Sequence, residues 1–180
     1  MRILLENTAL AVIDVQERLT PHIHEHQAVV ERIARLIKGA QALALPIIVN
    51  EQYKKGLGET VAELKTLVSE APHFEKVTFS SCDDEATLAH LQQLGRNNII
   101  LCGIETHVCV MQTALDLLEK GFVPIVVADA TGSRFANDAE IAIQRLRQAG
   151  AVISTSESLL FELCRSSKHP AFKTISGLVK

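Results

Sequence analysis

The sequence contains no tryptophan and few aromatic residues of any kind. One tyrosine and six phenylalanines make up 4% of its 180 residues, and the formal net charge is −3 at pH 7. Proteins that bind nucleic acids usually present a basic surface, and those that bind single strands add aromatic side chains for base stacking. Neither feature is present, so we expect no nucleic-acid partner.

Long apolar runs, paired cysteine motifs and glycine-rich loops are absent as well. The first apolar run, residues 9–13, ends at Asp14 and is too short for a signal peptide or a membrane span. No CxxC pair occurs, and without an export signal free thiols in a reducing compartment are more common than disulfides. The first strand candidate is not followed by GxGxxG, so a dinucleotide cofactor is poorly supported. We therefore expect a cytoplasmic protein with no membrane partner.

The sequence does contain a regular alternation of apolar strands and amphipathic helices. Strands are predicted at residues 8–13, 46–50, 73–77, 99–102, 123–127 and 151–154. Helices are predicted at residues 29–44, 60–68, 108–121, 137–149, 157–164 and 170–178, and a polar loop at 53–58. A further helix is predicted between a cap at Ser81 or Asp83 and a stop at Gly95. No repeat or linker interrupts the pattern, which indicates a single domain over residues 1–180. The alternation predicts a three-layer α/β/α fold, in which ligands bind beyond the carboxyl ends of the parallel strands.

The segment 99–111 joins the fourth strand to a helix and carries a thiol. An apolar run ends at Gly103, and helical spacing starts at Val108. Cys109 thus lies in the first turn of a helix, for which Thr106 is the candidate N-cap. The positive end of the helix favours a thiolate over a thiol. A lone cysteine is nevertheless more often a small buried apolar residue.

Three reactive side chains lie at or just past predicted strand ends. Asp14 follows the first strand, Lys76 lies in the third and Cys109 follows the fourth. A carboxylate can accept the thiol proton, and an ammonium can lower the pKa of the thiol or keep the carboxylate charged. Backbone amides of the turn before Cys109 can hold an oxyanion. Each residue alone has an ordinary structural explanation, but together they suit acyl transfer through a thioester.

These residues resemble a known family. Asp14-Val-Gln16, Lys76 and Gly103-Ile-Glu-Thr-His-Val-Cys109 are similar to the signature of the isochorismatase-like cysteine hydrolases, and the resemblance covers nearly the whole chain. Segments 51–58 and 128–134 are similar to the branch of isochorismatase domain-containing proteins. The resemblance implies a Rossmann-like six-stranded parallel sheet in the order 3-2-1-4-5-6. It also implies a homo-oligomer, which in this family is a dimer, a tetramer or a larger ring.

The resemblance assigns roles to individual residues. It implies a catalytic triad in which Cys109 is the nucleophile, Asp14 the general base and Lys76 its charged partner. It further implies a cis peptide bond between Ile104 and Glu105, which would aim the amides of Glu105 and Cys109 at a carbonyl oxygen of the substrate. The third strand lies two places from the first, about 9–10 Å away. Lys76 must therefore reach across the intervening strand, or its own strand must bend.

Two departures from the family pattern narrow the expected chemistry. Nicotinamidase-like members carry an Asp-x-His metal pair after the second strand, where this chain has Asn50-Glu-Gln-Tyr53. A bound zinc or iron is therefore not expected, and neither is any other cofactor. Members that cleave the vinyl ether of isochorismate often lack the cysteine, which is present here. Its presence favours a small amide or a related acyl compound as the substrate.

Three further residues are candidates for contact with the substrate: Gln16, Tyr53 and His107. His107 is also an alternative base, although we favour a turn residue that contacts a neighbour or a subunit interface, because Asp14 already fills that role. The run His22-Ile-His-Glu-His26 has alternating histidines, but we expect a polar loop there rather than a metal site.

The leading hypothesis is a hydrolase of small amides, and two alternatives stay open. The same fold can serve a non-catalytic binding or assembly protein, because long apolar helices also suit subunit packing. A thiol redox sensor that uses Cys109 is the other alternative. The reactivity of Cys109 toward iodoacetamide separates them: a hyper-reactive thiol at neutral pH favours an enzyme or a sensor, and an inert thiol favours an assembly protein.

Overall fold

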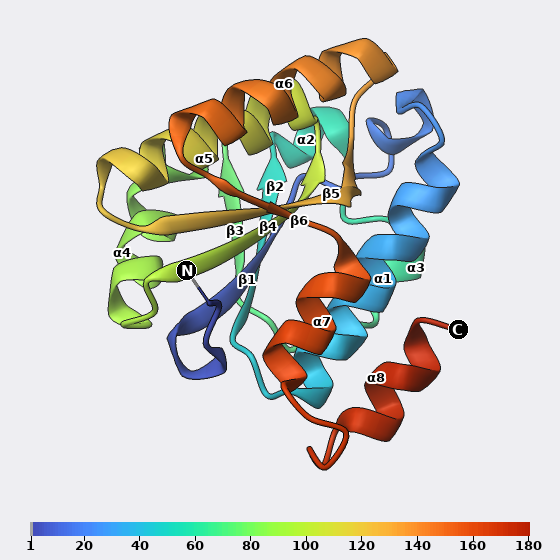
Figure 1. Ribbon diagram of the computed structural model, residues 1–180. Coiled ribbons are helices and arrows are strands. Elements are labelled where there is room, and N and C mark those ends of the chain that lie inside the picture. Colours follow the sequence, from blue (N-terminus) through green and yellow to red (C-terminus); the bar gives the residue numbers. More distant parts are fainter. Residues whose placement is uncertain (1) are drawn as a thin grey trace.

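The computed structural model describes residues 2–180 as a six-stranded parallel sheet with helices on both faces (Figure 1). The strands are β1 (Thr8–Ile13), β2 (Ile47–Gln52), β3 (His73–Lys76), β4 (Asn98–Ile104), β5 (Val123–Gly132) and β6 (Val152–Ser154). The strand order β3-β2-β1-β4-β5-β6 confirms the order implied by the family resemblance. β1 pairs with both β2 and β4, so its carboxyl end lies where the strand order reverses.

Helices cover both faces of this sheet. In the described part of the chain they are α1 (His26–Ala42), α2 (Lys54–Leu57), α3 (Ala62–Lys65), α4 (Glu85–Gln93), α5 (Met111–Glu119), α6 (Ala136–Ala149), α7 (Ser156–Cys164) and α8 (Phe172–Leu178). Helices α4, α5 and α6 lie on one face, and α1, α7 and α8 lie on the other (Figure 1). No helix in residues 2–180 is long and apolar enough to cross a membrane.

Two apolar cores lie between the sheet and its helices. Every residue of β1 is buried, and alternate side chains of the strand point to opposite cores. Leu10 and Val12 belong to the first core, beneath α1. Ile13 belongs to the second core, beneath α4 and α5, and Cys109 belongs to it as well. Burial on both faces explains why β1 is a continuous apolar run.

Gly103 lies where the two central strands approach each other most closely. It pairs with Ile13 across β1 and β4 and has a φ of 122°. A Cβ atom at this position would lie 2.0 Å from the carbonyl oxygen of Ile13. Only glycine tolerates both the backbone angle and the contact. We predicted that the strand ends at Gly103, but β4 continues through it to Ile104.

Other boundaries differ where strand pairing overrides local signals. β2 extends past Asn50 to Gln52 because it pairs with β3, with Gln52 opposite Lys76. β5 extends to Gly132, which pairs with the end of β4. The predicted loop at 53–58 contains the short helix α2, and the helix predicted at 60–68 is reduced to α3 followed by turns.

Candidate active site

Asp14 and Lys76 form a buried ion pair. Lys76 Nζ lies 2.7 Å from Asp14 Oδ2, and neither side chain has solvent-exposed area. Asp14 follows β1 with a φ of 53°, so the alternation of the strand ends there. Lys76 lies at the end of β3 and extends past β2 to reach it. The expected reach across the intervening strand is therefore confirmed.

The ammonium of Lys76 is surrounded by oxygen atoms. Besides Asp14, it donates to Gln52 Oε1 at 2.7 Å and to the carbonyl oxygens of Thr78 and Phe79 at 3.1 and 3.0 Å. A protonated lysine has only three N–H donors, and four acceptors compete for them here. Lys76 is thus placed to act on Asp14 and has no N–H to spare for an acyl group.

Cys109 lies in a π-helical turn, Thr106–Val110, between β4 and α5. It is only 5% exposed. Burial is the main cause that raises the pKa of its thiol to about 12; the charge of Asp14 raises it further, and the charge of Lys76 opposes both. The thiol is therefore protonated at neutral pH. The charge of Lys76 thus favours the thiolate, as we expected, but burial outweighs it.

A protonated thiol needs a base, and the carboxyl group of Asp14 is placed for that role. Its Oδ2 accepts from Lys76, whereas Oδ1 has no hydrogen-bond partner within residues 2–180. Burial raises the pKa of Asp14, while the charge of Lys76 and an interaction with the Cys109 thiol oppose that rise. A carboxylate with a raised pKa is a stronger base, so the difference between its pKa and that of the thiol is smaller.

The turn before Cys109 begins with a cis peptide bond. The bond between Ile104 and Glu105 is cis, as the family resemblance implied. The N-cap position of the turn is occupied by Glu105 and not by Thr106, so our prediction of the cap was wrong. The buried hydroxyl of Thr106 has no hydrogen-bond partner in the described chain. The Glu105 carboxylate accepts from the backbone N and the Nε of Arg134, at 3.1 and 3.2 Å.

Gln16 follows Asp14 by two residues and is fully buried. Its Nε2 donates to the carbonyl oxygens of Gln52 and Gly58 at 2.9 and 2.7 Å, and its Oε1 accepts from the backbone N of Gln52 at 2.7 Å. Main-chain atoms thus form hydrogen bonds with both the nitrogen and the oxygen of the Gln16 amide. This placement departs from the predicted substrate contact, because the side chain holds the end of β2 instead.

Tyr53 and His107, the other predicted substrate contacts, lie outside the fully buried cluster. Tyr53 is half exposed, and its backbone N donates to the carbonyl oxygen of Lys76 at 2.9 Å. The His107 ring lies 2.9 Å from Ser133 Oγ through Nδ1 and 3.9 Å from Asp138 Oδ2 through Nε2. It thus contacts the start of α6, in agreement with the contact that we favoured over a catalytic role.

Gln52 belongs to the cluster and was missed by the reasoning from the sequence. The predicted second strand ended at Asn50, which left Gln52 in a loop with no expected partner. In the structure its side chain contacts the ammonium of Lys76. The signal that places it there is the register of β2 against β3, and residue spacing does not reveal that register.

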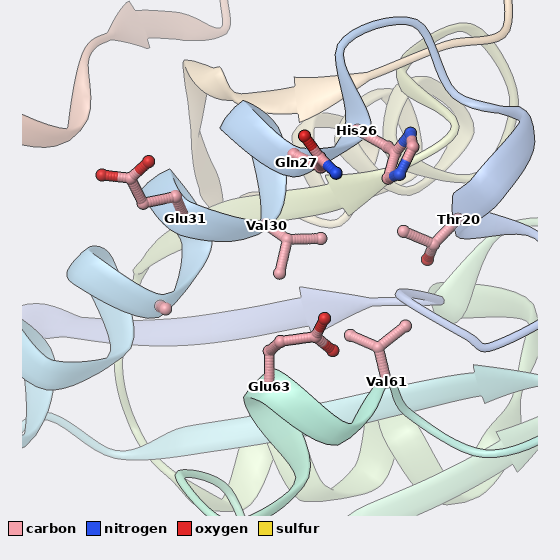
Figure 2. Close-up of a pocket in the computed structure, with 8 residues that line it drawn as sticks. Thr20, His26, Gln27, Val30, Glu31, Val61 and Glu63 are labelled. Carbon is pink, nitrogen blue, oxygen red and sulfur yellow. The ribbon is translucent and has the colours of Figure 1, made fainter.

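Outside this cluster, a cavity of about 350 Å³ lies between α1 and residues 61–63 (Figure 2). Figure 2 shows the carboxylate of Glu63 and the side chains of Thr20 and Val30 around it. Val30 and Val61 belong to the first core, so the sheet separates this cavity from Cys109. In residues 2–180, no three His, Cys, Asp or Glu side chains are grouped so that they could hold a metal ion.

Comparisons with known proteins point to one family and one fold. The isochorismatase domain model matches residues 8–158. Isochorismatase domain-containing protein 1 of Salmo salar is 42% identical over 173 residues, which cover 96% of this chain and 61% of that protein. The structure of MAR1 ribonuclease from Caenorhabditis elegans is 42% identical with a TM-score of 0.94, and the match covers 99% of this chain and 92% of that chain. YcaC from Escherichia coli, described as an octameric hydrolase of unknown specificity, is 27% identical with a TM-score of 0.94 and coverage of 99% and 90%.

The matched range includes all six strands as well as Asp14, Lys76 and Cys109. This chain spans about three-fifths of the length of the Salmo salar protein. The domain match and the identity over nearly the whole of this chain lead to one conclusion. The chain belongs to the isochorismatase family.

Proposed function

We propose that the chain is a hydrolase that cleaves a small amide or a related acyl compound through a thioester on Cys109. The observation that carries the proposal is the buried Asp14–Lys76 pair, whose carboxyl group interacts with the buried thiol of Cys109. Buried charges are costly unless they are paired, and a carboxylate that interacts with a cysteine has a direct use as its base. The description of YcaC as a hydrolase supports the same reaction class.

The proposed reaction has two stages, the formation of the thioester and its hydrolysis. Asp14 takes the proton of the Cys109 thiol as the sulfur attacks the carbonyl carbon of the substrate. The C–N bond then breaks, and the leaving nitrogen takes the proton from Asp14. Asp14 next removes a proton from water, whose oxygen attacks the thioester. The C–S bond breaks, the acid leaves, and the thiolate recovers its proton from Asp14.

Backbone amides hold the oxyanion in this proposal. Lys76 is excluded from that role because four oxygen atoms already surround its ammonium. The first amides of a helix lack partners within it, and the turn that contains Cys109 opens such a helical segment. The amides of Glu105 and Cys109 remain the candidates, since they lie at the start of this turn and at the nucleophile itself.

The test is ammonia release from a panel of small primary amides. We expect turnover by the wild-type protein and none by the Cys109→Ala variant. Intact-mass measurement after rapid acid quenching should show one added acyl group on the wild-type protein only. An RNA substrate is included because the C. elegans relative is called a ribonuclease. Full turnover by the Cys109→Ala variant on any active substrate would rule out the thioester.

The two alternative functions are less well supported. Redox-sensing cysteines are accessible and have a low pKa, whereas Cys109 is buried and burial raises its pKa. An assembly protein would have no use for a buried ion pair. Replacing such a pair by apolar side chains of similar volume often leaves the stability of a protein unchanged or raises it.

The proposed enzyme acts as a homo-oligomer. Val77 and Phe79 follow Lys76 by one and three residues, and they expose 76% and 55% of their surface despite being apolar. Exposed apolar patches of this kind mark interaction surfaces, and YcaC is described as octameric. Light scattering at several protein concentrations should show a multimer. The Val77→Lys/Phe79→Lys variant should dissociate, and a monomeric wild-type protein would contradict the proposal.

A further inference from the structure

Gln52 is bonded through every polar atom of its side chain and main chain. Its Oε1 accepts from Lys76 Nζ at 2.7 Å, and its Nε2 donates to the carbonyl oxygen of Val77 at 2.8 Å. The Gln52 amide can adopt only one orientation, because the carbonyl oxygen of Val77 only accepts hydrogen bonds and the ammonium of Lys76 only donates them. The main chain of Gln52 is clamped by the Gln16 amide through bonds of 2.7 and 2.9 Å.

We propose that Gln52 is a positioning residue that holds the Lys76 ammonium within hydrogen-bond distance of Asp14. The inference rests on the proposed function, because it concerns the strength of Asp14 as the base for Cys109. Gln52 touches no reacting atom in this scheme. It acts only through the lysine, whose position it sets together with the carbonyl oxygens of Thr78 and Phe79.

The neutrality of Gln52 is the feature that matters. The charged and titratable groups that face Asp14 are Lys76 from β3, Cys109 from the π-helical turn and, more distantly, Glu51 from β2. The charge of Glu51 is paired with Lys54 at 3.0 Å. Lys76 is therefore the cation that acts most strongly on Asp14. A neutral acceptor orients this cation without competing for its charge, whereas a carboxylate at position 52 would compete.

The test measures the alkylation of Cys109 by iodoacetamide between pH 4 and pH 10, by peptide mass spectrometry. Asp14 and the thiol share one proton over part of this range, so the rate should rise to a plateau as the pair loses its first proton. In the Gln52→Glu variant the acid midpoint should move to higher pH by roughly one unit, because the new carboxylate disfavours the ionisation of Asp14. In Gln52→Met the shift should have the same direction and be smaller, because an ammonium that Gln52 no longer holds in place can move away from Asp14.

The matched control is Gln41→Met. The Gln41 amide donates to the carbonyl oxygen of Leu67 at 2.6 Å, in the same way that Gln52 donates to Val77, but it lies far from the ion pair in α1. This variant should leave the midpoint unchanged. A midpoint that stays at the wild-type value in Gln52→Met, and in Gln52→Glu where that variant folds, would overturn the inference.

The failure of the proposed function would look different. The Asp14→Asn variant removes the base, so the rise of the alkylation rate at acid pH should disappear. If the wild-type profile were the same as that of Asp14→Asn, the proposed base would be wrong, and the role of Gln52 would fall with it. If the two profiles differ and the Gln52 variants do not shift, only the inference about Gln52 is wrong.

Discussion

Lys76 Nζ and Asp14 Oδ2 lie 2.7 Å apart although their strands, β3 and β1, are not neighbours in the sheet. The flexible stem of the lysine spans β2, and three other oxygen atoms fix its ammonium. The position of Asp14 depends in turn on the close approach of Ile13 and Gly103 just before it. The candidate site is thus built on the central strands of the sheet, with the base where their order reverses.

Removing the base should abolish most of the activity. We expect Asp14→Asn to lower the rate of ammonia release by about 10²- to 10⁴-fold, which is the usual contribution of a general base. His107→Ala should have a much smaller effect, because its ring contacts Ser133 and Asp138. Steady-state rates of the two variants on one substrate decide between them. A greater loss in His107→Ala would make the histidine the base.

The activity should fall on the acid side. Asp14 must be ionised to accept the thiol proton, so turnover is lost as the pH falls through the pKa of this carboxyl group. Burial raises that pKa above the ordinary value of 3.8. The midpoint of the acid limb in a plot of kcat/KM against pH should therefore lie above 3.8. Full turnover at pH 3.8, in protein that circular dichroism shows to be folded, would contradict this role.

Breaking the buried ion pair should destabilise the fold. Lys76→Met leaves the carboxylate of Asp14 buried without a counter-charge, which typically costs about 3–5 kcal/mol of the free energy of unfolding. The double variant Lys76→Met/Asp14→Asn removes both charges and should be more stable than Lys76→Met alone. Urea unfolding at pH 7 measures all three proteins. Additive losses in the double variant would show that the two charges are not coupled.

Gly103 should tolerate no side chain. In Gly103→Ala the new Cβ would meet the carbonyl oxygen of Ile13 at 2.0 Å, so the central strands must move apart. We expect a loss of about 3 kcal/mol or more in the free energy of unfolding. Gly95 is the matched control, because it also has a positive φ but no atom near its Cβ position. Gly95→Ala should cost about 1 kcal/mol, and equal losses at the two sites would argue against the close approach.

Glu51 should contribute stability that acid removes. It is buried, and two bonds of 2.8 Å from Thr60 and a contact of 3.0 Å with Lys54 favour its charged form. Burial alone would raise the pKa of Glu51, but these partners outweigh burial and lower it. Its contribution is thus complete above the ordinary value of 4.5 and is lost as the pH falls through the lowered pKa.

The Glu51→Gln variant measures this contribution. At pH 7 its free energy of unfolding should be about 2 kcal/mol below that of the wild-type protein, because hydrogen bonds to a charged group are lost. The difference should shrink once the pH falls well below 4.5, where the wild-type carboxylate also takes up a proton. A difference that is constant down to pH 3 would show that the charge of Glu51 does not matter.

Features of this molecule that depend on local sequence patterns were predicted better than features that depend on tertiary contacts. The six strands were located from apolar runs, and Asp14, Lys76 and Cys109 were singled out from their places at or just past strand ends. The errors concern features that depend on neighbouring strands. β2 reaches Gln52 because β3 lies beside it, and β4 passes through Gly103 because the strand pairs with β1 there. Thr106 lies inside a π-helical turn, a form that no capping rule predicts.

The sequence by itself determined the layered α/β architecture and the chemical identity of the reactive groups, because periodicity and residue type are local properties of the chain. Only the tertiary structure decided that Lys76 contacts Asp14, that Gln52 contacts the lysine and that burial raises the pKa of the Cys109 thiol. Contact across strands depends on register, and the pKa of a thiol depends on burial. Strand register and burial are both set only when segments far apart in the chain pack together.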